Sequence, residues 1–296
     1  MAQPQSVVAS LWSFWSRAQR AERVGYIVGV LLLVSGLIHL AILVIGGGSW
    51  QGPVSLRKPT TFGLSFGLTL ITILWVASFL QLGARARPVL LSAFTAACAV
   101  ETALVSLQAW RGVPSHFNLE TTFDGLVART LAAGGLVLVA VIVVLALASF
   151  RANLAVPISL RIAIRVGFVA LVGAVVAGAT MIARGMMLVF AGDPQAAYAT
   201  GGALKPTHAV TMHAILVLPL LAWLLSFAHW SERRRTAAVL VAVAGYVVLA
   251  GVVAVANVAS IELGRMPPAM IALFVVGVVL VLATTILAVF TPLRRQ

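Results

Sequence analysis

Charged side chains are scarce in this chain. Only 9% of its 296 residues are Asp, Glu, Lys or Arg, whereas a soluble domain carries about a quarter. Apolar residues make up 61%, and the mean hydropathy is +1.09. A surface of this composition is not kept in water, which excludes soluble enzyme folds, nucleic-acid-binding modules and disordered scaffolds. The sequence therefore predicts a polytopic membrane protein without a nucleic-acid partner.

Cysteine and lysine are also rare. The single cysteine, Cys98, excludes an internal disulfide and any CxxC metal or redox pair. It lies in an apolar run, where an inert buried thiol is expected. The only two lysines, Lys58 and Lys205, fall outside the expected membrane spans. No lysine is then available for a retinal Schiff base, which excludes a retinal photoreceptor.

Long apolar runs define the fold class, which is all-α, an eight-helix transmembrane bundle. A bilayer crossing needs about 20 apolar residues. Runs of this length lie near residues 24–46, 60–82, 89–110, 125–149, 162–184, 207–229, 237–259 and 269–291. The predicted domains are an amphipathic cytoplasmic arm over 1–23, one transmembrane domain over 24–291, and a basic cytoplasmic tail over 292–296. The aromatic and arginine pattern of the arm favours a short helix at the membrane interface.

Basic residues indicate the orientation, because short loops rich in Lys and Arg stay in the cytoplasm. Thirteen of the 20 fall on one side of the predicted bundle: Arg17, Arg20, Arg23, Arg85, Arg87, Arg151, Arg161, Arg165, Arg233, Arg234, Arg235, Arg294 and Arg295. The other seven are Arg57, Lys58, Arg111, Arg129, Arg184, Lys205 and Arg265. We therefore expect an inner-membrane protein with both termini in the cytoplasm. Most of the net charge of +13 is a topology signal.

Three ionisable residues lie at similar depth in the predicted outer leaflet. His39 and His213 are about 10 and about 9 Å from the outer ends of their spans, and Glu101 is about 14 Å below Trp110, at 1.5 Å per helical residue. An ionisable group inside a span is a functional candidate by default, because it is costly unless paired or hydrated. We expect these three side chains to converge in one layer.

Glu101 belongs to a helical face that also carries Phe94, Cys98 and Gln108, at spacings of four, three and seven residues. That face should point into the bundle. A buried carboxyl without a cation beside it is expected to be neutral. Glu101 is therefore either a proton carrier or a hydrogen-bonded packing group.

Other soft or basic ligands lie on the same side. His208 and His213 are five residues apart, so they cannot both face one centre within a regular helix, and His213 is the better interior candidate. His116 lies in the second outer loop. Methionine and histidine together form the soft ligand set of Cu(I) and can also ligate haem iron, although methionine is a common packing residue. The six methionines after the first all fall on the outer side, namely Met181, Met186, Met187, Met212, Met266 and Met270.

A basic rim is predicted above this layer. Arg57, Lys58, Arg111 and Arg184 could hold haem propionates, a lipid phosphate or an anionic substrate. The alternative is that these residues and the neighbouring tryptophans only anchor the protein at the membrane interface.

The first functional hypothesis is a haem b or copper protein for redox or metal handling, with a redox partner on the outer side. His39 and His213 would be opposed ligands, with His208, His116 and Met212 as further metal ligands and Glu101 as the catalytic proton carrier. Eight helices with outward histidines and a membrane glutamate resemble haem A synthase or the copper resistance D family. The resemblance covers helix count and residue type.

Two alternatives remain open. Ser35-Gly36-Leu37-Ile38-His39 is similar to the S-x-x-x-H element of the ceramidase and progestin-receptor-like hydrolases. That resemblance implies a zinc-dependent intramembrane lipid hydrolase in which zinc activates water. Its companion H-x-x-x-H pattern is not matched by His208 and His213. The other alternative is a transporter or accessory membrane subunit, in which Glu101 and the basic rim form the path of a small anionic substrate.

Overall fold

The computed structural model describes residues 6–200 and 202–293. The first five residues of the predicted arm, and Arg294 to Gln296 of the predicted tail, lie outside the described residues. The described part is helical and contains no strand. Its elements are α1 (Val7–Arg17), α2 (Arg20–Ile45), α3 (Arg57–Ala77), α4 (Ala86–Trp110), α5 (Thr122–Ser149), α6 (Ile158–Phe190), α7 (Pro194–Thr200), α8 (Lys205–Leu225), α9 (Glu232–Val258), the 3-10 turn η1 (Leu263–Arg265) and α10 (Pro268–Leu293).

Eight of these helices, all except α1 and α7, are long and apolar enough to cross a membrane. The predicted fold class is therefore confirmed, and each span lies close to its predicted position. The largest difference is α6, which has 33 residues where the sequence predicts a span over 162–184. The short helix expected in the N-terminal arm is present as α1, and its place at a membrane interface stays a prediction.

The two lysines lie in helices, in contrast to their predicted place outside the spans. Lys58 and Lys205 belong to the first turns of α3 and α8. Each is followed directly by a proline, Pro59 or Pro206. Proline is compatible with a first turn because the N–H that it lacks has no partner inside the helix. These prolines therefore begin the helices, although they resemble loop residues in the sequence.

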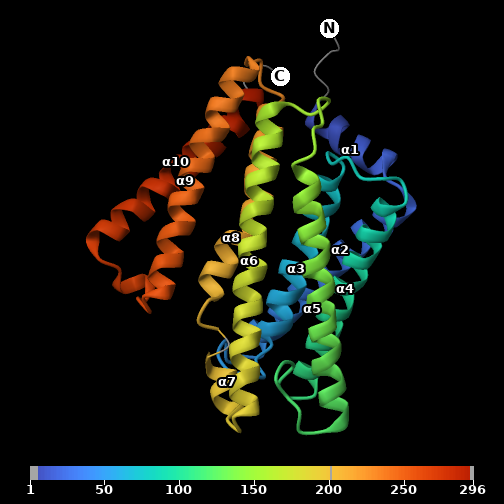
Figure 1. Ribbon diagram of the computed structural model, residues 1–296, viewed down its shortest axis with the longest axis vertical. Coiled ribbons are helices and arrows are strands. Elements are labelled where there is room, and N and C mark those ends of the chain that lie inside the picture. Colours follow the sequence, from blue (N-terminus) through green and yellow to red (C-terminus); the bar gives the residue numbers. More distant parts are fainter. Residues whose placement is uncertain (1–5, 201, 294–296) are drawn as a thin grey trace.

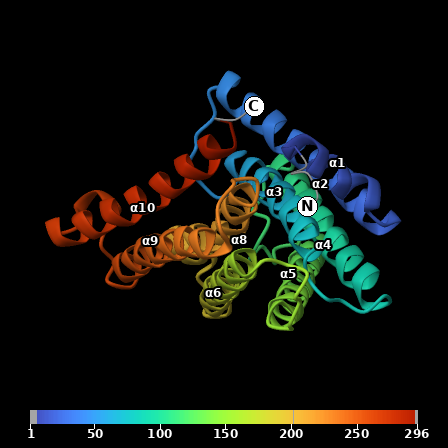
Figure 2. The same ribbon diagram turned by 90° about the horizontal axis from the view of Figure 1, so that it is seen from above.

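Five helices, α3, α4, α5, α6 and α8, surround a common core (Figure 2). Each contributes a large side chain with at most 1% of its surface exposed: Leu70, Phe94, Leu145, Phe168 and Leu218. Neighbours in this ring pack closely, except that α3 and α8 touch only lightly and leave a seam. Outside the ring, α2 packs on α3, and the hairpin of α9 and α10 leans away from the other helices (Figure 1).

Glycines allow the closest helix contacts. A Cβ atom on Gly63 would lie 2.6 Å from the backbone nitrogen of Gly36, and one on Gly67 would lie 2.7 Å from the carbonyl oxygen of Gly29. Gly63 and Gly67, four residues apart, thus let α2 and α3 approach closely, as small residues do between membrane helices. The α9–α10 hairpin uses the same device, because Gly245 faces Gly277.

Helix α1 and the C-terminal turn of α10 lie at the same end of the bundle (Figure 1). We call this the predicted cytoplasmic end, and the other, where α2 ends and α3 begins, the predicted outer end. The orientation in a membrane stays a prediction. At the predicted cytoplasmic end, Phe14 of α1 packs against Trp75, Phe79 and Trp223. This aromatic cluster fixes the arm to the bundle.

Candidate functional site

The loop over residues 111–121 closes part of the predicted outer end. Phe117 has a φ of 66°, a left-handed conformation that a bulky residue rarely adopts. Its ring occupies the space that a side chain at Gly185 of α6 would fill. The ring of Phe117 therefore holds the loop against α6 by filling the space beside Gly185. A strained backbone conformation of this kind is maintained only where surrounding contacts enforce it.

His116 lies beside this anchor, with its ring against Phe62 of α3 and Phe117. Its Nδ1 is 3.0 Å from the hydroxyl of Ser115. Burial, together with the nearby positive charge of Lys58, lowers the pKa of His116 from 6.5 to about 3. The imidazole is therefore uncharged at neutral pH. It adds no positive charge to this end of the molecule.

Arg111 is neutralised within the protein. Its guanidinium donates to Asp124 Oδ1 at 2.5 Å and to the side-chain oxygen of Gln108. Asp124 also accepts from the Gln108 amide at 2.8 Å and from the Thr121 hydroxyl at 2.7 Å. This network fills the gap between α4 and α5. Because its charge is already compensated, Arg111 does not contribute a free cation to the predicted rim.

Three other cations form an unpaired group, which we call the basic cluster: Arg57, Lys58 and Lys205. Lys58 is close enough to experience the charges of both Lys205 and Arg57, and Lys205 experiences the charge of Arg57. The described residues, 6–200 and 202–293, form four ion pairs. None of these pairs includes a member of the basic cluster. Arg57 donates from Nε to the carbonyl of Trp50 at 2.9 Å. The last predicted rim residue, Arg184 on α6, is exposed.

His39 is buried between the ends of α2 and α4, and both of its ring nitrogens have partners. Nδ1 donates to the carbonyl of Ser35 at 2.8 Å, and Nε2 accepts from the indole N–H of Trp110 at 3.0 Å. The residue therefore joins the two helices. Ligation of a metal through Nε2 would require the hydrogen bond to Trp110 to break.

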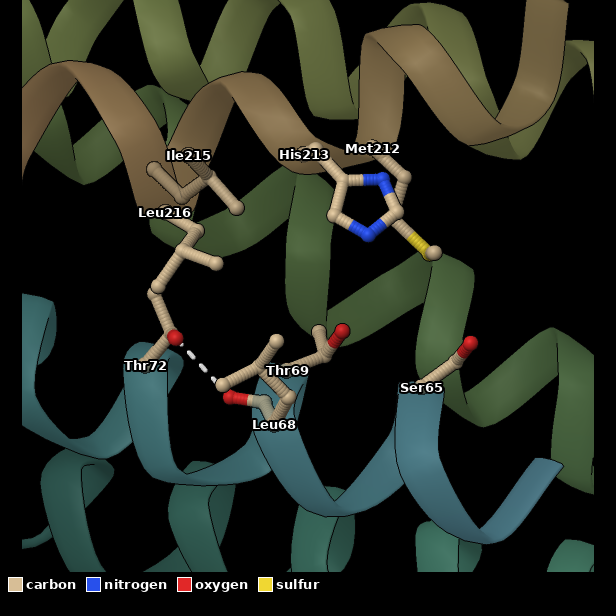
Figure 3. A pocket seen from close by; sticks show the side chains of 8 residues that line it. All are labelled: Ser65, Leu68, Thr69, Thr72, Met212, His213, Ile215 and Leu216. Carbon is tan, nitrogen blue, oxygen red and sulfur yellow. Dashed lines mark hydrogen bonds between the residues drawn. The ribbon is translucent and has the colours of Figure 1, made fainter. Parts of the chain in front are cut away.

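His208 and His213 point in different directions, as their spacing predicts, but the expectation that His213 is the interior one is wrong, because His213 is exposed and His208 is partly buried. His208 lies against α6, where Nδ1 donates to the carbonyl of Ala174 at 2.7 Å and Gly178 leaves room for the ring. His213 and Met212 instead line a small pocket in the seam between α3 and α8, facing Ser65 and Thr69 (Figure 3). The pocket encloses about 10 Å³, about one water molecule. Nδ1 of His213 is bonded to the carbonyl of Ala209 at 2.6 Å, which leaves Nε2 free for a ligand.

Glu101 is buried between α4 and α5, as expected for its helical face, with Phe94, Cys98 and Gln108 buried as well. The carboxyl lies against Gly134, where a Cβ atom would be 2.5 Å from Oε1. Oε1 has no hydrogen-bond partner. A side chain at position 134 would displace the carboxyl.

The expected convergence of His39, Glu101 and His213 is not seen. Each contacts a different neighbouring helix, so equal depth does not bring them together. In the described part of the chain, no group of three or more His, Cys, Asp or Glu side chains is placed to hold one metal ion. The geometry thus separates the residues of the first hypothesis.

Two features of this end are missing from the sequence-based site. Asp124 anchors the network around Arg111, and the Thr121-x-x-Asp124 spacing of a helix cap could have indicated it. Ser65, Thr69 and Thr72 form a polar stripe on α3, at helical spacings of four and three. Comparison of the chain with protein-family models, curated proteins and solved structures finds no match.

Proposed function

We propose that this multi-pass membrane protein binds a small anionic substrate at its predicted outer end and transports it. The observation that carries the proposal is the basic cluster of Arg57, Lys58 and Lys205, which has no carboxylate partner in the described ranges. Like charges held together destabilise one another, and an anion placed among them removes that repulsion.

Helix geometry reinforces this preference. Lys58 and Lys205 lie in the first turns of α3 and α8. Helix N-termini carry unpaired N–H groups and a partial positive charge, which favours anions. Arg111, which is compensated by Asp124, and His116, which is uncharged, add no free positive charge beside the three cluster residues.

The seam between α3 and α8 lies beneath the cluster and supplies neutral polar groups. Ser65 and Thr69 present hydroxyl groups, and His213 presents a free Nε2. The two hydroxyl groups can donate to the oxygens of an anion after it leaves the lysines, whereas Nε2 of His213 can accept from an O–H group that the anion carries. The light packing of α3 against α8 makes this seam the place where the ring of helices separates most readily.

The test is a calorimetric titration of the full-length protein in detergent with two probes, inorganic phosphate and dihexanoyl phosphatidylglycerol. If only phosphate binds, the substrate is a soluble anion. If only the lipid binds, the substrate is a lipid whose headgroup phosphate the cluster recognises. Lys58→Gln should weaken binding by about tenfold or more, equivalent to about 1.4 kcal/mol. Lys58→Arg, which keeps the positive charge, should retain most of the wild-type affinity.

Arg265→Gln is the matched control, because Arg265 is exposed at the same end and pairs with Glu262. It should leave the affinity unchanged. The proposal fails if neither probe binds, or if both variants behave alike. Uptake of labelled phosphate or lipid by proteoliposomes then tests transport, and binding without uptake would assign the protein the role of an accessory anion-binding subunit.

Copper binding is a second candidate because His213 and Met212 line the same pocket (Figure 3). An imidazole nitrogen with a thioether is a soft ligand pair suited to Cu(I). Metal analysis after Cu(I) loading should show one equivalent of copper that is lost in His213→Ala and retained in His208→Ala. Haem ligation by His39 and His213 together receives no such support, since His39 is bonded to Trp110.

A further inference from the structure

Four buried polar atoms without hydrogen-bond partners gather on the outer half of α4 and the loop after it. They are Oε1 of Glu101, Oγ1 of Thr102, Oγ of Ser106 and Nδ2 of Asn118. From Glu101 to Ser106 the helix rises about 7.5 Å and turns through about 140°, with Thr102 between them, so a route that joins these groups follows the surface of the helix. Buried polar groups in proteins are almost always satisfied by protein or by ordered water. Unpaired groups on adjoining turns therefore indicate bound water in this region.

In the part of the chain that the structure describes, no cation pairs with Glu101. The facing residue on α5 is Gly134. Arg129, five residues nearer the predicted outer end, has its guanidinium beside Gly125 instead. Asp124 of the same helix is bound to Arg111.

The other helices that pack on α4 supply none either. On α2, His39 is bonded to Trp110. On α3, Lys58 lies in the first turn, within the basic cluster. Cys98, one turn before Glu101 on α4, is the titratable group in electrostatic contact with it, and it is uncharged as a thiol. An ionised carboxylate without a cation beside it in such a place is costly, which favours the neutral acid.

We infer that Glu101 is a proton-binding site that exchanges its proton with the predicted outer side through water held by Thr102, Ser106 and Asn118. In this step the O–H bond of the carboxyl breaks, and the proton passes to a bound water as hydronium. The reverse step restores the neutral acid. The hydrated segment at Ser106 lies only four residues before the end of α4. This inference does not depend on the proposed anion site.

The first experiment uses dicyclohexylcarbodiimide, which reacts with protonated carboxyl groups in apolar surroundings. The wild-type protein is treated in proteoliposomes at pH values from 5 to 9, and the modified residues are found by peptide mass spectrometry. Glu101 should be modified, with the yield falling as the pH rises, and Glu101→Gln should abolish the signal. Asp124, bound to Arg111, is the internal control and should stay unmodified. Absence of label on Glu101, or a yield that does not change with pH, would overturn the inference.

The second experiment measures access with single cysteines in a Cys98→Ala background. Ser106→Cys is compared with Leu107→Cys, because Leu107 is one residue nearer the end of α4 and has 40% of its surface exposed. A charged methanethiosulfonate reagent needs water to reach a thiol. Ser106→Cys should react at least about tenfold faster, although it is the more enclosed site. If Ser106→Cys reacts at the same rate as Leu107→Cys or more slowly, water does not reach Ser106 and the inferred route does not exist.

Discussion

The indole N–H of Trp110 donates to Nε2 of His39 across 3.0 Å, and the same imidazole donates from Nδ1 to its own helix. His39, which the sequence suggests as a metal or haem ligand, thus forms a hydrogen bond that joins α2 to the end of α4. This contact and the bond to Ser35 give both ring nitrogens a partner within the protein, which offsets the cost of an ionisable residue in a span.

Trp110→Phe should therefore destabilise the protein through His39. Loss of one hydrogen bond costs about 0.5–1.5 kcal/mol, and a double-mutant cycle with His39→Ala should give a coupling energy in that range. Denaturant titration in detergent measures the free energy of unfolding. Trp50→Phe is the control, because Trp50 lies half exposed in the loop between α2 and α3. Additive effects of the two substitutions would show that the bond contributes nothing.

Asp124→Asn tests whether the network at the start of α5 is structural. The substitution removes the negative charge opposite Arg111. It also replaces one of the two carboxylate oxygens, which accept from Arg111 and from the Thr121 hydroxyl, with an amide NH2 group. We expect a loss of about 1–3 kcal/mol, typical of a buried hydrogen-bonded group left with a poor partner. The same titration should show a change of at most about 0.5 kcal/mol for Glu262→Gln, whose ion pair with Arg265 is almost fully exposed. Similar losses in both variants would contradict a structural role for Asp124.

The sequence predicts the properties that belong to one helix at a time. Hydropathy placed all eight spans, and the 3.6-residue period identified the buried face of α4 that holds Glu101. The spacing of Gly63 and Gly67 on α3 is a signal of the same kind, because these two residues meet Gly36 and Gly29. Each of these signals is local in the chain.

Properties that depend on the order of helices around the bundle were not accessible. The depths of His39 and His213 can be counted along their helices, but their directions depend on which helix lies next to each. The predicted layer therefore failed although the depths were similar. The predicted rim failed in part for the same reason, because Arg111 is compensated by Asp124 on the following helix.

Gly63→Ala should separate α2 from α3. The new methyl group would lie within 2.7 Å of backbone atoms of Gly36 and Leu32, which cannot rotate away as a side chain would. Overpacking of this kind costs about 1–3 kcal/mol. Gly173→Ala is the matched control, because its Cβ meets no atom within 4 Å. That variant should be neutral or up to about 1 kcal/mol more stable, as expected for alanine in a helix. Unfolding in detergent measures both, and a stable Gly63→Ala protein would contradict the close contact.

The last prediction concerns the acid sensitivity of the predicted outer end, through His116. Burial and Lys58 lower the pKa of His116 to about 3 in the folded protein, against 6.5 for the free side chain. Between these values the unfolded chain binds a proton that the folded protein excludes. His116 therefore lowers the stability progressively as the pH falls from about 6.5 towards 3, and it has no such effect above that window.

His116→Gln should remove this contribution. The wild type should lose stability between pH 7.5 and pH 4.5 more steeply than the variant, when unfolding free energies are measured in one detergent at each pH. His229→Gln, an exposed histidine at the predicted cytoplasmic end, controls for the loss of an imidazole and should keep the wild-type slope. Because the ring packs against Phe62 and Phe117, His116→Gln also loses some stability at pH 7.5. The slope and not the absolute value is therefore the test, and an unchanged slope would mean that protons reach His116 in the folded protein.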